Sequence, residues 1–527
     1  MPNPISDKYL KEIETFFSKT LGKLKQFNKL KLTKNERTSY DILEWECEIN
    51  LESLKYNKDL LPLDQFVGFH LTVGQLASGE SAQPFLTAKH YDDWLKRLGG
   101  FVDFCSTAVE KMKKGIKENI VLPKALTLKI IPQIENLTND SLDKSIFFSP
   151  IKLIRDNNKI SNADKERIIL AYKNYIRNKL NPALRYLLHF IKNKYLPASR
   201  ETSGYSSLPN GTAWYEHEIK TYTTLDIKAE AIFQLGKSEV SRIRNEMESV
   251  KNQVGFTGTL LEFFNYVRNN KELMPFKKPE EVIENFNQIH KRMIPYLNKT
   301  FDLVPKSKFE VRRTEAFREA SASAEYIPPS LDRKRPAVFY VPIPNVEKYN
   351  YFSDEDLFLH EAIPGHHYQI SLQQENKTLP EFRKTLWYSA YGEGWALYAE
   401  SLGHELGLYK DPFQYFGMLS AEMHRAIRLV VDVGIHALNW TRKDAINYSL
   451  ENEAESEEGI IAEIERYMAI PGQALSYKIG QLKILELRSK AETELEFHNQ
   501  LLKHGCLPLR ILENKIISWI EDTKRKR

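Results

Sequence analysis

The chain has 527 residues, 42% of them hydrophobic and 28% charged, a composition that excludes wholesale disorder. Gly 23 and Pro 24 together make up about 9% of the chain, below the roughly 12% of average usage, which disfavours a turn-rich all-β fold. The 75 basic and 70 acidic residues leave a formal net charge of +5, too small an excess over this length to indicate a nucleic-acid-binding protein.

Apolar residues recur at three- and four-residue spacing along most of the N-terminal half, which predicts amphipathic helices. These periodic segments are residues 7–25, 36–78, 87–116, 163–193 and 225–253. A turn-rich stretch separates the last two, and Pro279 suits the first turn of a further helix. We expect a helical subdomain over residues 1–200 and a second over 201–527, the two forming one helical body around a cleft.

Three cysteines, Cys47, Cys105 and Cys506, are too few for a disulfide framework and lack C-x-x-C spacing, so we expect small buried side chains. No apolar run approaches the roughly 18 residues needed to span a bilayer. The N-terminus has no basic region followed by an apolar stretch, so no signal peptide is visible. The sequence leaves two alternatives for the compartment: the cytoplasm or, if a signal peptide was removed, the periplasm. The oligomeric state also stays open.

Just before residue 345, the sequence predicts β-strands instead of helix. Residues 308–313 alternate like a strand, and residues 337–343 are rich in β-branched and aromatic side chains. A loop over 321–336 joins them. Pro342 and Pro344 would leave gaps in a hydrogen-bonded ladder, which favours an edge position for residues 337–343. The predicted fold is mainly α, with a small β-sheet next to the helix that follows.

That following helix contains His360-Glu361. A His-Glu pair with a second His four residues after the first is the zincin arrangement, because residues four apart share a helix face and can bind one Zn²⁺. Here Pro364 occupies that position, cannot bind metal and disfavours a straight helix. A two-residue bulge would bring His366 to the place of the second ligand, and we prefer it to the alternative, His367.

Glu393 opens an otherwise apolar helix about 25 residues past His366, so its carboxylate is expected to point inward. Zincins of the glutamate class take their third ligand from a second helix at about this separation. We expect His360, His366 and Glu393 to bind one Zn²⁺ and leave a fourth position for water. The alternative is an acidic helix start favoured by the helix dipole alone. Glu400, two turns along, is expected to be structural.

A polar set, His424, Arg428, Asp432 and His436, recurs every four residues on an apolar helix over 423–440. Each step of four rotates by about 40°, so the four side chains cannot all face one point. Arg428 and Asp432 could simply form a buried ion pair. Four groups that are costly to bury nevertheless indicate a wet cleft.

Four ordered segments, HEAIPGHH, GEGWALYAE, RLVVDVGIH and PGQALSYKIG, make the chain resemble the bacterial domain of unknown function 885 family. The resemblance runs from about residue 205 to 510 and more loosely before that. The family is similar to the helical glutamate-zincins, a group that includes angiotensin-converting enzyme and thermostable carboxypeptidases. It departs from their His-Glu-x-x-His motif by an apparent two-residue insertion at Pro364-Gly365. The resemblance implies a zincin-like catalytic subdomain and a zinc metallopeptidase.

The candidate residues then take roles in peptide hydrolysis. Glu361 is expected to be the general base. Tyr477, just after a helix restarts, and His436 are candidate donors to the oxyanion, with Asp432 able to hold the imidazole protonated. Tyr477 could also be an ordinary half-buried aromatic residue. Arg428 fits a clamp for a substrate carboxylate, which favours a carboxypeptidase over an endopeptidase.

The expected partner is a peptide substrate, which could add as an extra strand to residues 337–343. A small hairpin that only covers the helices is the alternative for this segment. For the whole protein, the alternative is a catalytically inactive, metal-containing protein that holds peptides. An intact Glu361 favours the enzyme, because a mere metal holder needs no base beside its first ligand. A di-metal carboxylate bundle would need paired Glu-x-x-His motifs, which the sequence lacks.

Overall fold

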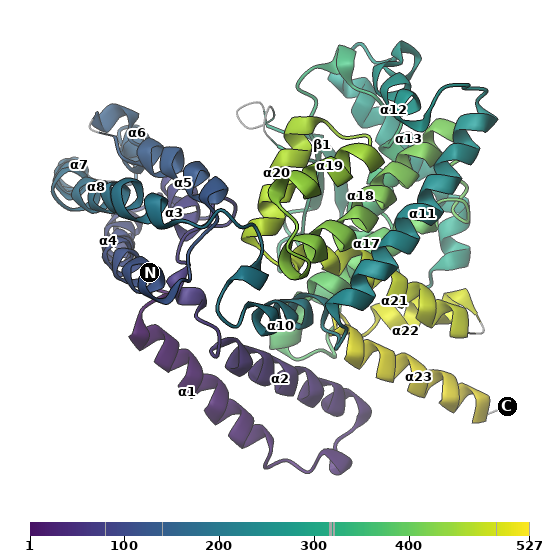
Figure 1. Cartoon of the computed structure of the whole chain (residues 1–527), viewed down its shortest axis with the longest axis horizontal. Helices are drawn as coiled ribbons and strands as arrows, with labels where there is room; N and C mark the ends of the chain where they lie inside the picture. The colour runs from purple at the N-terminus through teal and green to yellow at the C-terminus, as the bar shows by residue number, and fades with distance from the viewer. Residues whose placement is uncertain (80, 140, 316–318, 320–321, 492, 526–527) are drawn as a thin grey trace.

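The computed structural model describes residues 1–525 apart from 80, 140, 316–318, 320–321 and 492. Within this range the chain is mainly α-helical with one small sheet, which confirms the predicted fold class (Figure 1). The helices are α1 (Asp7–Leu24), α2 (Lys34–Ser53), α3 (Phe69–Ala77), α4 (Ala88–Glu118), α5 (Lys124–Leu137), α6 (Ser149–Ile154), α7 (Asn162–Tyr175), α8 (Asn181–Phe190), α9 (Leu196–Ala198), α10 (Gly211–Thr223), α11 (Ala229–Gln253), α12 (Leu260–Asn269), α13 (Pro279–Thr300), α14 (Asp354–Glu361), α15 (His366–Glu375), α16 (Glu381–Lys384), α17 (Ser389–Ser401), α18 (Pro412–Ala437), α19 (Arg442–Asn452), α20 (Glu457–Ala469), α21 (Ser476–Lys490), α22 (Glu494–Leu502) and α23 (Leu509–Arg525). The strands are β1 (Phe309–Arg313), β2 (Glu325–Ile327) and β3 (Ala337–Val341).

Helices α3 to α9 form a group of their own at one end of the molecule, where α4 packs along α7 and α8 (Figure 1). Their apolar faces enclose a hydrophobic core that includes Trp94, Phe101, Ile168 and Leu184, all fully buried. The apolar spacing over 87–116 correctly predicts α4, and that over 163–193 covers α7 and α8, because these helices bury one face. Helices α5, α6 and α9 lie outside the predicted periodic segments.

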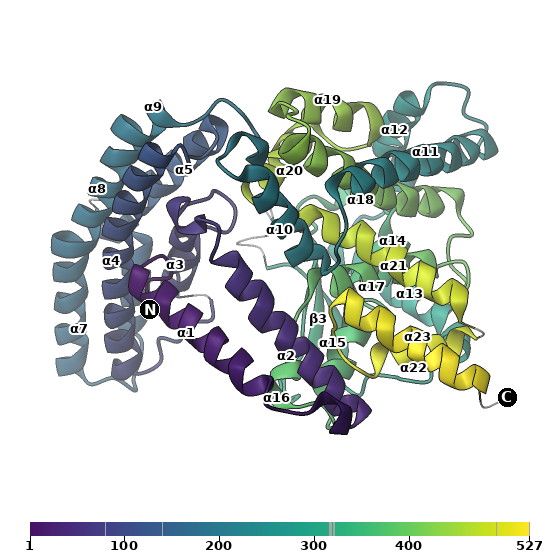
Figure 2. The same ribbon diagram turned by 60° about the horizontal axis from the view of Figure 1, so that its bottom comes forward.

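A larger core fills the rest of the molecule, from α10 to α23. It also takes in apolar side chains from before residue 200, among them Ile42 of α2 and Leu126 of α5. Helices α1 and α2 form a hairpin outside the group of α3 to α9, and α2 contacts α10 and α23 (Figure 2). The predicted periodic segment 36–78 is thus two helices, α2 and α3, that serve different cores. The subdomain boundary at residue 200 stays a prediction.

Close helix contacts position the elements that carry the candidate residues. Helices α17 and α21 approach through Gly394 and Gly480, where a Cβ on Gly480 would lie 1.9 Å from the carbonyl oxygen of Ala390. Helices α11 and α18 meet at Gly236, where a Cβ would lie 2.7 Å from the Cβ of Leu429. Only glycine allows these backbones to come so close, so the sequence specifies where the helices touch.

The sheet has the order β1-β3-β2, with β1 parallel and β2 antiparallel to β3. It lies next to α14 as predicted, since the ring of Phe309 in β1 contacts that of Phe358 in α14. The predicted edge position of residues 337–343 is wrong, because β3 is the central strand. Pro342 and Pro344 follow the end of β3 at Val341 and interrupt no pairing. The edge strand β2 lies within the segment predicted to be a loop.

The three cysteines are buried and free, as expected. Among the described residues, no helix is long and apolar enough to cross a membrane, in agreement with the sequence.

Candidate metal centre

The second histidine is brought beside the first by a break between two helices. Helix α14 ends at Glu361 and α15 begins at His366, so a four-residue break replaces the predicted two-residue bulge. A Cβ on Gly365 would lie 1.9 Å from the carbonyl oxygen of His360, so only glycine lets the chain fold back this tightly. The Trp395 indole of α17 donates to the carbonyl oxygen of Pro364 at 2.9 Å and fixes the break.

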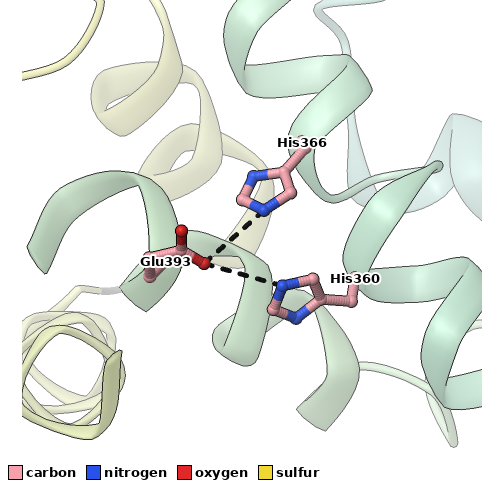
Figure 3. A group of neighbouring side chains, drawn as sticks. All are labelled: His360, His366 and Glu393. Carbon is pink, nitrogen blue, oxygen red and sulfur yellow. Dashed lines mark ion pairs between the residues drawn. The ribbon is translucent and has the colours of Figure 1, made fainter. Parts of the chain in front are cut away.

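Three side chains from these helices converge, as Figure 3 shows. The Nε2 atoms of His360 and His366 each lie 3.6 Å from Oε2 of Glu393. One ligand atom from each residue lies within 4.8 Å of the other two, and both histidines are buried. Glu393 lies in the second turn of α17, which begins four residues earlier than predicted. The structure therefore groups the three residues that the sequence predicts as metal ligands.

The spacing of these atoms suits a tetrahedral ion. Two ligands bound to Zn²⁺ at 2.0–2.1 Å in tetrahedral geometry lie about 3.4 Å apart, close to the observed 3.6 Å. Two imidazoles and one carboxylate also form a donor set typical of catalytic zinc. His360, His366 and Glu393 thus fit a zinc ion by both chemistry and spacing.

Glu400 and Asp356 support the cluster from behind. Nδ1 of His360 donates to Oε1 of Glu400 at 2.5 Å, which turns Nε2 toward Glu393. Carboxylates that bind the outer nitrogen of a metal-binding histidine fix its orientation in this way. Burial and the Glu400 carboxylate raise the pKa of Asp356 well above its ordinary value.

The close approach of the imidazoles and the carboxylate shifts the pKa values of Glu393 and His360. Burial acts to raise the pKa of Glu393, but the imidazoles of His360 and His366 outweigh it and lower this pKa below its usual range. Burial acts to lower the pKa of His360, yet Glu393 and Glu400 raise it well above its ordinary value. The carboxylates of Glu393 and Glu400 therefore stabilise a positive charge at this site.

The cluster lies in the wall of a cleft of about 830 Å³. Glu361, Tyr477 and Arg428 also line this cleft, as do Phe66 and Val67 from the segment before α3. Among the described residues, neither the Glu361 carboxylate nor the Tyr477 hydroxyl has a hydrogen-bond partner. Both groups are therefore available to a bound molecule.

Arg428 is held firmly while one of its nitrogens stays free. Its Nε donates to the Tyr467 hydroxyl at 3.0 Å, and its Nη2 lies 3.0 Å from Oε2 of Glu463. The guanidinium also lies 4.6 Å from the centre of the Tyr477 ring. Its Nη1 is buried without a hydrogen-bond partner in the described part of the chain. The alternative ion pair with Asp432 does not form.

His436 does not belong to the cleft, so its predicted role as oxyanion donor is corrected. It is fully buried, with Nδ1 accepting from the backbone N–H of Tyr205 at 3.1 Å and Nε2 donating to the carbonyl oxygen of Tyr467 at 2.9 Å. Asp432 does not hold it, because that carboxylate accepts from the Tyr215 hydroxyl and the N–H of Gly472. Burial lowers the pKa of His436 to about 3. Its imidazole is neutral and structural.

His367 points away from the cluster and holds the edge of the sheet. Its Nδ1 lies 3.1 Å from the Tyr326 hydroxyl of β2 and 3.2 Å from Oγ of Ser371. Burial lowers the pKa of His367 to about 4. The structure thus separates the two adjacent histidines into one in the cluster and one that supports β2.

Sequence reasoning missed several residues of the site. The structural role expected for Glu400 stays a prediction, and the sequence does not predict its contact with His360. Its spacing of seven from Glu393, two helical turns on the same face, was the available signal. Trp387, whose ring lies 5.8 Å from that of His366, and Tyr326 were also missed, since neither lies in a spacing pattern with the ligands.

The fold and the site define a mainly α-helical protein with a His-His-Glu cluster in the wall of a cleft. The model of the family "Bacterial protein of unknown function (DUF885)" matches residues 2–516, so the chain belongs to this family. The resemblance noted in the sequence is confirmed to that extent. No curated protein matches the sequence.

Two solved structures share the fold. One is described as the putative lipoprotein from Colwellia psychrerythraea. It is 26% identical, with a TM-score of 0.87 over 98% of this chain and 92% of that one. The other is a putative lipoprotein of unknown function from Shewanella oneidensis. It is 18% identical, with a TM-score of 0.75 over 98% of this chain and 94% of that one. At 18% identity, the similarity to the Shewanella oneidensis protein shows a shared fold only.

Proposed function

We propose that the protein is a zinc-dependent peptidase related to the helical glutamate-zincins. The observation that carries this proposal is the convergence of His360, His366 and Glu393 at tetrahedral spacing in a cleft that also exposes Glu361. An ion held there would polarise a substrate carbonyl and acidify a water molecule.

The remaining chemistry falls to side chains of the cleft. Glu361 follows His360 directly and accepts a proton from the attacking water, then passes it to the leaving amine. The Tyr477 hydroxyl donates a hydrogen bond to the carbonyl oxygen as negative charge develops on it. With His436 buried elsewhere, Tyr477 is the donor that we retain.

We favour a carboxypeptidase over an endopeptidase because of Arg428. Its guanidinium lines the cleft in a fixed orientation between Glu463 and the Tyr477 ring, which suits the binding of a carboxylate. The free C-terminus of a short or extended peptide would supply that carboxylate.

The test is the variant Glu361→Gln, which preserves the size of the side chain and removes its ability to accept a proton. We expect it to bind zinc and to fold like the wild type, but to hydrolyse peptides about 10²–10⁴ times more slowly. The exposed Glu381→Gln of α16 is the control and should keep full activity. A Glu361→Gln variant as active as the wild type would contradict the mechanism. A wild type that binds zinc and peptides without cleaving them would instead indicate an inactive peptide-binding protein.

We propose further that the chain works outside the cytoplasm. The support is that two proteins of the same fold are described as putative lipoproteins, and lipoproteins are attached to a membrane by lipid chains. Fractionation of cells that produce the protein from its own gene should place it with the envelope. Recovery in the cytoplasmic fraction would contradict this placement.

A further inference from the structure

A second cavity opens beside the metal cluster, on the other side of Trp387. It has a volume of about 370 Å³ and is lined by Trp45, Glu46, Tyr222, Trp387 and Tyr388, among other residues. Trp387 and Tyr222 line both this cavity and the cleft of the metal cluster. The two spaces therefore adjoin, and one bound molecule can extend from the cleft into the cavity.

Trp387 is fixed in place although its side chain is 43% exposed. A Cβ on Gly392 of α17 would lie 2.0 Å from its ring, so the indole packs directly on that helix backbone. The centre of the ring also lies 5.8 Å from that of His366. A rigid, exposed indole next to the metal cluster is suited to pack against a substrate rather than to fill a core.

The cavity contains one carboxylate without a cationic partner. Glu46 of α2 accepts a hydrogen bond from the Tyr388 hydroxyl at 2.7 Å, and it forms no ion pair among the described residues. The nearby lysines are already neutralised, since Lys58 pairs with Glu218 at 2.6 Å and Lys220 with Glu52 at 2.8 Å. Burial raises the pKa of Glu46, as expected for an acid that lacks a counter-ion, although the Tyr388 hydroxyl acts in the opposite direction.

We infer that this cavity is a subsite for an ammonium group of the substrate, bound by the Glu46 carboxylate between the aromatic rings of Trp45, Tyr222, Trp387 and Tyr388. Aromatic faces and a carboxylate are the two groups that bind ammonium ions best in proteins. The ammonium group would come from the amino terminus of a short peptide or from a lysine side chain. This inference rests on the proposed function and adds to it a preference for peptides with a positive charge on the side of Trp387.

The test uses the zinc-loaded full-length Glu361→Gln chain, so that peptides bind without being consumed. Calorimetric titration compares Ala-Ala-Ala, acetyl-Ala-Ala-Ala and acetyl-Lys-Ala-Ala. We expect at least one peptide that carries an ammonium group to bind about ten times more tightly than acetyl-Ala-Ala-Ala. Tighter binding of Ala-Ala-Ala alone would identify the amino terminus, and that of acetyl-Lys-Ala-Ala alone the lysine side chain.

Adding Glu46→Gln should abolish this preference and leave the binding of acetyl-Ala-Ala-Ala unchanged, because an amide can keep the bond to Tyr388. Glu48→Gln, at an exposed position of α2, is the matched control and should keep the preference. Equal binding of all three peptides, or a preference that survives Glu46→Gln, would overturn the inference. The proposed function would stand in that case if wild-type enzyme cleaves acetyl-Ala-Ala-Ala. A failure to bind any peptide would overturn both.

Discussion

The guanidinium of Arg428 lies 4.6 Å from the centre of the Tyr477 ring, yet we expect the two side chains to act at different stages of turnover. A phenylalanine at 477 keeps the ring beneath Arg428 and removes only the hydroxyl. Tyr477→Phe should therefore lower kcat about a hundredfold and leave KM nearly unchanged, since an oxyanion donor acts only in the transition state. Steady-state kinetics on one peptide measure both constants, and an unchanged kcat would exclude Tyr477 as the donor.

Arg428 should act on binding instead. Arg428→Ala is expected to raise KM for peptides with a free C-terminus by about tenfold or more, because a charge-assisted hydrogen bond is lost. The same peptides with an amidated C-terminus are the control and should show little change. If both kinds of peptide lose the same amount of affinity, Arg428 supports the cleft rather than binding the carboxylate.

His436 shows how a residue pattern can mislead. Its place four residues after Asp432 suggested a protonated imidazole, whereas its two nitrogens meet one N–H donor and one carbonyl acceptor, which only the neutral ring satisfies. Burial lowers its folded-state pKa to about 3, against an ordinary value of 6.5. The unfolded chain binds the extra proton between these values, so the stability that neutral His436 contributes is present above pH 6.5 and is lost as the pH falls toward 3.

This linkage can be measured by comparison with a residue that does not titrate. His436→Gln should lower the free energy of unfolding at pH 7, and its deficit relative to wild type should shrink by about 2 kcal/mol between pH 7 and pH 5. Chemical denaturation of both proteins at the two pH values gives the difference. A deficit that stays constant, or grows on acidification, would mean that His436 is protonated in the folded protein.

At the scale of elements, helix contacts set the geometry of the cleft. Gly480→Ala would place a Cβ 1.9 Å from the Ala390 carbonyl oxygen and force α21 away from α17. We expect a loss of about 1–3 kcal/mol in stability together with reduced activity, since Tyr477 and Glu393 lie on these two helices. Gly22→Ala in α1, where no atom lies within 4 Å of the new Cβ, should instead stabilise the protein by about 0.5–1 kcal/mol. Thermal unfolding and peptidase assays on both variants test the contrast, and equal effects would contradict it.

The elements also show what sequence can predict. Apolar spacing locates α4 and α11 well, because each buries one face against a core, and it also locates the more exposed α1. The start of α13 is predicted by Pro279 instead. The three-residue strand β2 is missed, since it is held only by pairing with β3 and by the contact of Tyr326 with His367. The edge position assigned to residues 337–343 is wrong because the prolines lie beyond the last paired residue.

At the scale of the whole molecule, the cluster joins parts of the chain that local pattern alone cannot place. The ligands come from α14, α15 and α17, and the carboxylate behind His360 comes from the far end of α17. The lining of the cleft includes Phe66 and Val67, and the lining of the adjoining cavity includes Glu46 of α2. Local sequence motifs are sufficient to predict the three metal ligands. The other residues that line the cleft cannot be predicted in this way, because long-range packing brings them there.

Zinc titration of the purified full-length chain after chelation tests the central claim most directly. We expect one tightly bound Zn²⁺ per wild-type chain. Affinity should fall more than about a hundredfold in His360→Ala, His366→Ala and Glu393→Ala, since even the outer partners of metal ligands change affinity 10–100-fold. His367→Ala, adjacent to a ligand but bonded to Tyr326, should keep stoichiometric zinc. A wild type that binds no zinc, or zinc that is lost in His367→Ala and kept in His366→Ala, would contradict the account.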